Sequence, residues 1–280
     1  MSVSQQDYMQ DYKQDYKIFD MHTHAFPDKV AAKAISLTSA RADAPNYHDG
    51  SFESLLEFER AGGAAGFLLL PIATNGAMTV AVNDWVAEKM GEGVYAFGSI
   101  HPEFEDYEKE LDRIKAMGLK GIKMHPEYQG FFADEERVVP IYKAIFDRNL
   151  ILYFHAGEDP GFLPPVKADV RRIARVCDLF PQGRIVAAHM GGYRQYEAVS
   201  QCLAGRENLW FDTSFAAERM EPAEVLGLIR QHGVKRTLFG TDAPWAEFHS
   251  AKEALIRSGL NREELAAIFY DNAADLLDIK

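Results

Sequence analysis

The segment Ile18-Phe19-Asp20-Met21-His22-Thr23-His24-Ala25-Phe26-Pro27 is a short apolar run, typical of a buried β-strand, that leads directly into two histidines. An open sheet that binds a dinucleotide carries the glycine pattern G-x-G-x-x-G immediately after its first strand. This chain has His-Thr-His in that place. Its glycine-rich segment, residues 62–66, precedes the second apolar run and is more typical of a helix cap and a loop. The sequence therefore disfavours a dinucleotide-binding sheet.

The rest of the chain repeats a unit of one strand and one helix. Apolar runs of strand length alternate with helical patterns such as Ser51–Ala61, Tyr107–Met117 and Val138–Arg148. Strict alternation implies right-handed crossovers and a parallel sheet. Eight units in 280 residues predict a single (β/α)8 TIM barrel of the α/β class. The predicted strands are Ile18–His24, Gly66–Ile72, Val94–His101, Gly121–His125, Ile151–Ala156, Arg184–His189, Leu209–Thr213 and Thr237–Asp242.

Composition and charge predict one folded domain with a small-molecule partner. We expect a polar, flexible extension over residues 1–17, which repeats Gln-Asp-Tyr, and a barrel over 18–280. The net charge of −12 disfavours nucleic acid and anionic membranes, since both require a basic surface. The isolated Cys177 and Cys202 fit a reducing compartment, so a cytoplasmic location is the expectation. Folding does not require an oligomer, and assembly into a homo-oligomer stays open.

Histidines gather at the predicted strand ends. Six of the nine do so, and in a parallel barrel these ends form the face where active sites are built: His22, His24, His101, His125, His155 and His189. A single histidine there is more often structural, but six crowded imidazoles indicate a metal ion.

Two local patterns sharpen this prediction. Residues two apart on a strand point to the same side, so His22 and His24 can share one cation. Asp242 ends the last apolar strand, where an unpaired carboxylate would be costly to desolvate unless it met a cation. Lys123 and His125 form a similar pair on the fourth strand. A rim lysine and a turn histidine explain that pair as well as a functional site does.

Together these motifs resemble the amidohydrolase superfamily, in particular its amidohydrolase-related branch of metal-dependent hydrolases and aminocarboxymuconate semialdehyde decarboxylase. The resemblance covers about Lys17 to the C-terminus. It rests on His-x-His, Gly-Ile-Lys-Met-His-Pro, His-Ala-Gly, His-Met-Gly-Gly and Phe-Gly-Thr-Asp-Ala-Pro-Trp, in that order.

The resemblance implies a set of metal ligands, namely His22, His24, His155 and Asp242. It also implies that His189 is either the catalytic histidine or a ligand of a second ion. Lys123 could bridge two ions as a carboxylated lysine, with His125 as a competing candidate. A nitrogen and oxygen donor set suits Zn²⁺ best, with Mn²⁺ or Fe²⁺ as alternatives. One ion is favoured over two.

The expected activity is hydrolysis of a small amide, lactone or other ester by a metal-activated water. In this mechanism Asp242 takes the proton and His189 polarises the scissile carbonyl. The alternative in the same branch is a non-oxidative decarboxylase, for which Arg194 could bind the substrate carboxylate. A third interpretation, a metal-binding barrel without catalysis, is disfavoured by the intact ligand set.

Overall fold

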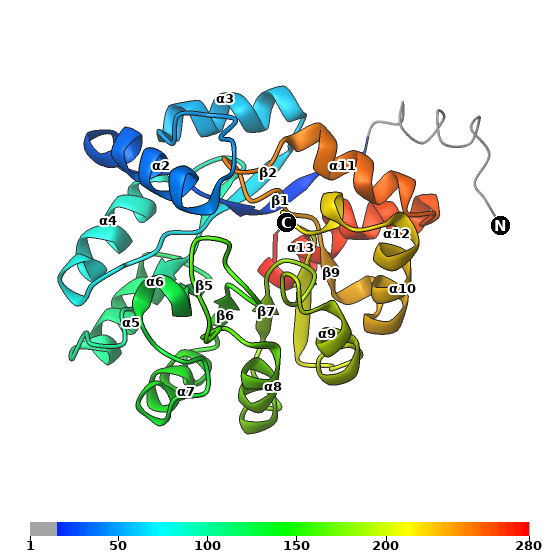
Figure 1. Ribbon diagram of the computed structural model, residues 1–280. Coiled ribbons are helices and arrows are strands. Elements are labelled where there is room, and N and C mark those ends of the chain that lie inside the picture. The colour runs from blue at the N-terminus through cyan, green and yellow to red at the C-terminus, as the bar shows by residue number, and fades with distance from the viewer. Residues whose placement is uncertain (1–15, 280) are drawn as a thin grey trace.

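Parallel strands occupy the centre of the molecule and helices surround them (Figure 1). The computed structural model describes residues 16–279. Every paired strand runs parallel to its neighbours, so the prediction of a (β/α)8 barrel is confirmed. The strands are β1 Phe19–Thr23, β2 Gly66–Leu69, β3 Val94–Ala96, β4 Gly98–Ser99, β5 Gly121–Met124, β6 Ile151–Phe154, β7 Ile185–Ala187, β8 Leu209–Asp212 and β9 Thr237–Leu238.

The first and last strands close the ring. The Met21 amide donates to the Phe239 carbonyl over 2.9 Å, and the Asp242 amide donates to the His22 carbonyl over 2.8 Å. Thr23 also forms a parallel bridge with Ala243. β1 and the segment that follows β9 are therefore neighbours, although more than two hundred residues separate them in the sequence.

The third predicted strand, Val94–His101, is wrong as one element, because the structure splits it into β3 and β4 at Phe97. The cause is Asn83, whose side-chain amide accepts from the Ser99 backbone amide and donates to the Ser99 carbonyl, over 2.8 and 3.2 Å. The Asn83 side chain thus provides the hydrogen bonds that a neighbouring strand would otherwise give to the backbone of Ser99. β3 therefore ends the sheet β1-β2-β3, and β4 begins the sheet β4 to β9.

Helices cover the outside of the barrel. Those that the sequence predicted at Ser51–Ala61, Tyr107–Met117 and Val138–Arg148 are confirmed within two residues at each end. The α-helices are α2 Asp28–Ala42, α3 Phe52–Gly62, α4 Thr79–Lys89, α5 Tyr107–Ala116, α6 Pro126–Gln129, α7 Val139–Asp147, α8 Val170–Leu179, α9 Tyr196–Cys202, α10 Pro222–His232, α11 Phe248–Arg257, α12 Arg262–Ala266 and α13 Asn272–Leu277.

The interior of the barrel is apolar at the end where the strands begin and polar toward the end where they finish. Near the beginnings of the strands it is apolar, with Phe19, Ile151 and Leu238 packed against Leu276 of α13. Alternate residues further along the strands place Lys123, Tyr153 and Asp212 inside, all fully buried. A polar layer therefore lies directly beneath the ends of the strands.

Most of the expected extension, residues 1–15, lies outside the described residues. The remaining two residues of the extension contact the barrel. The Tyr16 ring lies 5.1 Å from the Phe269 ring, and the Lys17 ammonium lies 3.7 Å from the Tyr270 ring centre. Within the described part of the chain, no helix combines the length and apolar character needed to span a membrane.

Candidate metal centre and active site

The structure brings the predicted site residues to one end of the barrel. Each of them lies near the carboxyl end of a strand or in the segment that follows it, and all but Arg194 are largely buried: His22, His24, Lys123, His125, His155, His189, Asp242 and Arg194. His101 also follows its strand, but its Nδ1 accepts from the Glu103 amide over 3.2 Å. This contact makes His101 a turn residue.

Three electron-rich atoms face one another at the centre of the site. The Nε2 atoms of His22 and His24 are 3.1 Å apart, and Asp242 Oδ1 lies 3.3 Å from each. Asp242 is held there with a left-handed backbone, φ 74°, which residues other than glycine rarely adopt. A non-glycine residue persists in that conformation only when its surroundings impose it.

The hydrogen-bond partners of the two imidazoles show which nitrogens carry hydrogen. His22 Nδ1 donates to the Asp212 carboxylate over 2.8 Å, and His24 Nδ1 donates to the Leu70 carbonyl over 2.7 Å. Both partners are acceptors only, so both Nε2 atoms are bare when the rings are neutral. Burial, reinforced by the Lys123 charge, lowers the pKa of His22 to about 3, so its ring is neutral at pH 7.

This donor set fits a divalent metal ion. Two bare imidazole nitrogens and a carboxylate oxygen repel one another at this spacing unless a cation lies among them. The three residues form one of the groups of close ligand atoms in the described part of the chain. The donor set fits a metal ion because His22 Nε2, His24 Nε2 and Asp242 Oδ1 are all atoms that bind divalent cations.

His155 offers a further bare nitrogen. His189 Nδ1 donates to the Ser214 carbonyl over 3.1 Å, so His189 Nε2 accepts from His155 Nδ1, also over 3.1 Å. His155 Nε2 is then free of hydrogen, and it is buried without a partner. In the structure His155 groups with His125 and Asp159 rather than with the three central atoms. Its role as a ligand of the central ion therefore stays a prediction.

His125 takes a different position from the one expected of a bridging ligand. Its ring stacks on His155 with centres 4.1 Å apart, and its Nδ1 accepts from the Tyr128 amide at the start of α6. Its Nε2 is therefore the protonated nitrogen and faces Asp159 Oδ2 at 3.4 Å. The structure thus pairs His125 with a carboxylate that the sequence analysis did not consider.

Lys123 lies beside the three central atoms. Its fully buried amine is 3.1 Å from His22 Nε2 and 4.6 Å from the centre of the Tyr153 ring. Burial lowers the pKa of Lys123 to about 8. A neutral amine can react with carbon dioxide to give the carbamate of a bridging lysine, so this position leaves both one-ion and two-ion sites open.

Lys123→Ala is expected to leave the metal content near one ion per chain, because the three central atoms hold one cation without the lysine. Elemental analysis of the purified variant measures this. Lys143→Ala is the control, since that amine pairs with Asp147 on the surface. A fall from two ions to one or fewer, partly restored by short carboxylic acids, would contradict the single-ion prediction.

Asp212, which the sequence analysis missed, supports the site from below. It is fully buried and accepts from His22 Nδ1, from the His189 amide over 2.9 Å, from Ser214 Oγ and from the Tyr153 hydroxyl. Burial alone would raise the pKa of Asp212, but its contacts with His22, His189 and Ser214 hold it below the ordinary value. The ionised carboxylate therefore keeps hydrogen on His22 Nδ1 and leaves Nε2 bare.

Asp212→Asn is expected to weaken metal binding by about 10- to 100-fold, because an amide no longer fixes the His22 ring as a carboxylate does. Competition with a metal-binding dye measures the affinity. Asp112→Asn, at an exposed carboxylate that pairs with Arg148, is the control. An unchanged affinity would show that His22 keeps its orientation without Asp212.

Aromatic rings border the histidine cluster. Ring centres lie 4.6 Å apart for Tyr128 and His125, 5.3 Å for Trp245 and His24, and 6.4 Å for Phe215 and His189.

Arginines lie over these rings or over their aromatic neighbours. Arg41 of α2 is 5.6 Å from the Tyr128 ring centre, and Arg219 is 3.6 Å from the Phe215 ring centre. Arg194, predicted as a substrate contact, lies 5.1 Å from the Tyr193 ring centre with its side chain more than half exposed. Arg219 also pairs with Glu218, and Arg194 lies 3.9 Å from Glu158.

Comparisons with known proteins agree with this fold. Residues 19–279 match a family model described as Amidohydrolase, and no curated protein matches the chain. An uncharacterised TIM-barrel protein from Bordetella bronchiseptica superposes with a TM-score of 0.76 at 18% identity, covering 94% of this chain and 98% of that chain.

Two similar solved structures are decarboxylases. For 5-carboxyvanillate decarboxylase from Sphingomonas paucimobilis, the TM-score is 0.70 at 15% identity, with 95% of this chain and 100% of that chain covered. For a dihydroxybenzoic acid decarboxylase from Polaromonas, with bound manganese and the inhibitor 2-nitroresorcinol, the TM-score is 0.68 at 15% identity, with 95% and 98% covered. Identities this low establish a shared fold alone.

Proposed function

The chain belongs to the amidohydrolase family, and from that premise we propose that it is a metal-dependent, non-oxidative decarboxylase of a small aromatic carboxylic acid. The sequence alone favoured hydrolysis and gave decarboxylation as the alternative. Two features support the alternative more strongly. One is the aromatic and arginine border of the site, and the other is the reaction named for several proteins that share the fold.

The border of the site carries this proposal. Tyr128, Trp245 and Phe215 offer flat apolar surfaces next to the histidines, while Arg41 and Arg219 lie over two of these rings. Aromatic rings pack well against a flat substrate, and arginine binds carboxylates in a bidentate manner. A substrate with both an aromatic ring and a carboxylate uses both kinds of surface.

Decarboxylation breaks the bond between the ring carbon and the carboxylate, releases carbon dioxide and leaves an electron pair on carbon that takes up a proton. His22, His24 and Asp242 would hold the metal ion, with His155 as the further ligand that the family resemblance implies. When bound, the ion supplies positive charge that orients the substrate and stabilises developing negative charge. Asp242 Oδ1 lies 3.3 Å from both imidazoles, and Asp242 is the residue proposed to pass a proton from solvent to that carbon.

For the metal itself we propose manganese before zinc. The two nitrogens and one oxygen at the centre accommodate either ion. Bound manganese in decarboxylases of the same fold supports the first choice. Reconstitution of metal-free protein with each ion in turn, followed by activity measurement, separates the two.

Carbon dioxide release from a panel of hydroxylated benzoic acids, including 2,6-dihydroxybenzoate and 5-carboxyvanillate, tests the proposed reaction. The same preparation is offered a panel of amides, lactones and phosphoesters. Decarboxylation of at least one acid, dependent on the metal, is expected. Turnover of a lactone or an amide without carbon dioxide release from any acid would restore hydrolysis as the function.

A further inference from the structure

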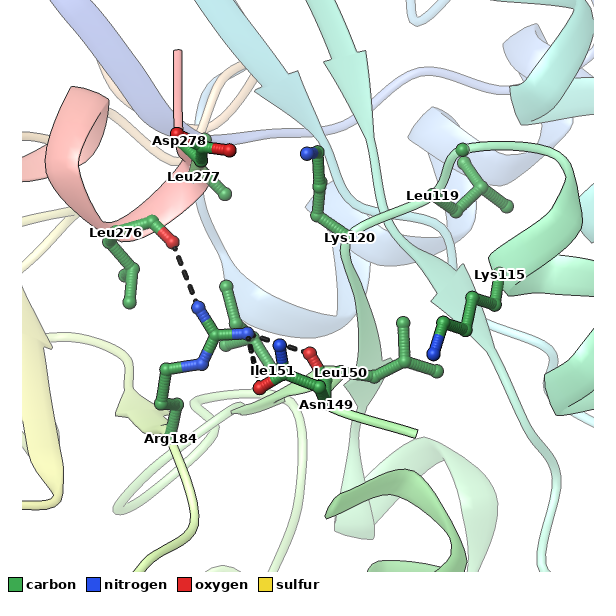
Figure 2. A pocket seen from close by; sticks show the side chains of 11 residues that line it. Lys115, Leu119, Lys120, Asn149, Leu150, Ile151, Arg184, Leu276, Leu277 and Asp278 are labelled. Carbon is green, nitrogen blue, oxygen red and sulfur yellow. Dashed lines mark hydrogen bonds between the residues drawn. The ribbon is translucent and has the colours of Figure 1, made fainter. Parts of the chain in front are cut away.

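A cluster of positive charge lies at the opposite end of the barrel from the histidines. A cavity of about 330 Å³ opens where three neighbouring strands begin (Figure 2). Lys120 immediately precedes β5, Leu150 precedes β6 and Arg184 precedes β7. The end of α13, Leu276 to Asp278, lines the same cavity. The cavity therefore lies between the strand beginnings and the last helix.

Arg184 is a half-buried cation that the surrounding chain does not neutralise. Its guanidinium donates to the carbonyls of Leu276 and Asn149, over 3.3 and 2.6 Å, and to Asn149 Oδ1 over 3.3 Å. These acceptors carry no net charge. Burial lowers the pKa of Arg184, and no described carboxylate forms an ion pair with it. A guanidinium has five N–H donors, so donors remain for a further partner.

Lys115 and Lys120 add two further charges to the wall of the cavity, and Figure 2 shows them with Arg184 around it. Neither amine forms an ion pair with a carboxylate of residues 16–279. Asp278 is the single acidic residue among those that line the cavity, so the lining carries an excess of two positive charges. This excess stands out in a chain with a net charge of −12.

We propose that this cavity, the basal pocket, binds a compact dianion of the phosphate or small dicarboxylate class, with Arg184, Lys115 and Lys120 as its charged partners. Two excess charges match a dianion. The planar guanidinium matches the oxygens of a phosphate or a carboxylate, and each lysine provides a point charge. The volume suits a small ligand.

A dianion in the basal pocket would connect the last helix to the beginnings of the strands. Arg184 already holds the end of α13 through the Leu276 carbonyl, while the lysines belong to the other wall. A ligand that binds only the folded chain raises its stability by mass action. The bound dianion is therefore a stabilising ligand of the face opposite the active site, independent of the reaction catalysed there.

Calorimetric titration of the full-length, metal-free protein with inorganic phosphate tests this proposal, with malonate as the dicarboxylate arm and chloride as the monovalent control. Metal-free protein is used because an ion at the other end of the barrel would itself bind anions. One phosphate or malonate per chain is expected, together with a rise in the melting temperature. The tighter of the two identifies the class of the ligand. Chloride binding of equal strength would overturn the proposal.

Variants locate the binding event. Lys115→Gln with Lys120→Gln should weaken binding by about tenfold or more, because two charge-assisted contacts are lost. Both lysines are exposed, so this double variant should fold normally, and circular dichroism checks it. Lys33→Gln, on the exposed face of α2, is the matched control, and His22→Ala should bind phosphate normally. Equal affinity in the double variant and the unaltered protein, or loss of binding in His22→Ala, would overturn the assignment.

Discussion

His22→Ala is expected to remove most of the bound metal and all turnover, and His24→Ala is expected to do the same. β1 and the residue directly after it provide two of the three electron-rich atoms that face one another at the centre of the site. Removing either imidazole leaves too few ligands to hold an ion tightly. Elemental analysis of the purified variants and assay of their turnover measure both effects.

His249→Ala is the matched control for these variants, since His249 is exposed on α11 and should be replaced without loss of metal. Circular dichroism should show that both site variants still form the barrel. Full metal occupancy in both His22→Ala and His24→Ala would contradict the assignment of these histidines as metal ligands.

Asp242→Asn is expected to keep most of the metal and to lower turnover by roughly 10²-fold or more. The amide keeps the shape of the side chain and one oxygen ligand, but it cannot hold and deliver a proton as a carboxyl group does. Metal content and the turnover number are measured on the same preparation, in parallel with Asp178→Asn at an exposed carboxylate that pairs with Arg206. Near-normal turnover would move the proton-handling role to His189.

The architecture and much of the site were open to prediction because a parallel barrel follows one simple rule. Residues at the carboxyl ends of its strands share one face, so residues as distant as His22 and Asp242 could be grouped from their positions alone. The break in the third strand was harder to predict. It depends on a single side chain, Asn83, which reaches from α4 to the backbone of Ser99. Gly98 within that run was the available signal.

Asp212 was also within reach of prediction from the strand ends. It ends β8, as Asp242 ends the last predicted strand, and the same argument about a buried carboxylate would have found it. The arrangement of hydrogens on His22, His155 and His189 could not be predicted, because it depends on which acceptor each ring meets in space. Arg41 was equally hidden, since it comes from a helix whose position relative to the rings follows only from the packing.

The closure of the ring at β1 has a consequence for biosynthesis. The ribosome makes His22 and His24 among the first residues of the barrel and Asp242 among the last. An emerging chain therefore cannot assemble the three central ligands until the segment after β9 has been synthesised and has paired with β1. Metal uptake should thus report closure of the ring, and the free energy of binding strengthens the contact between β1 and the segment after β9.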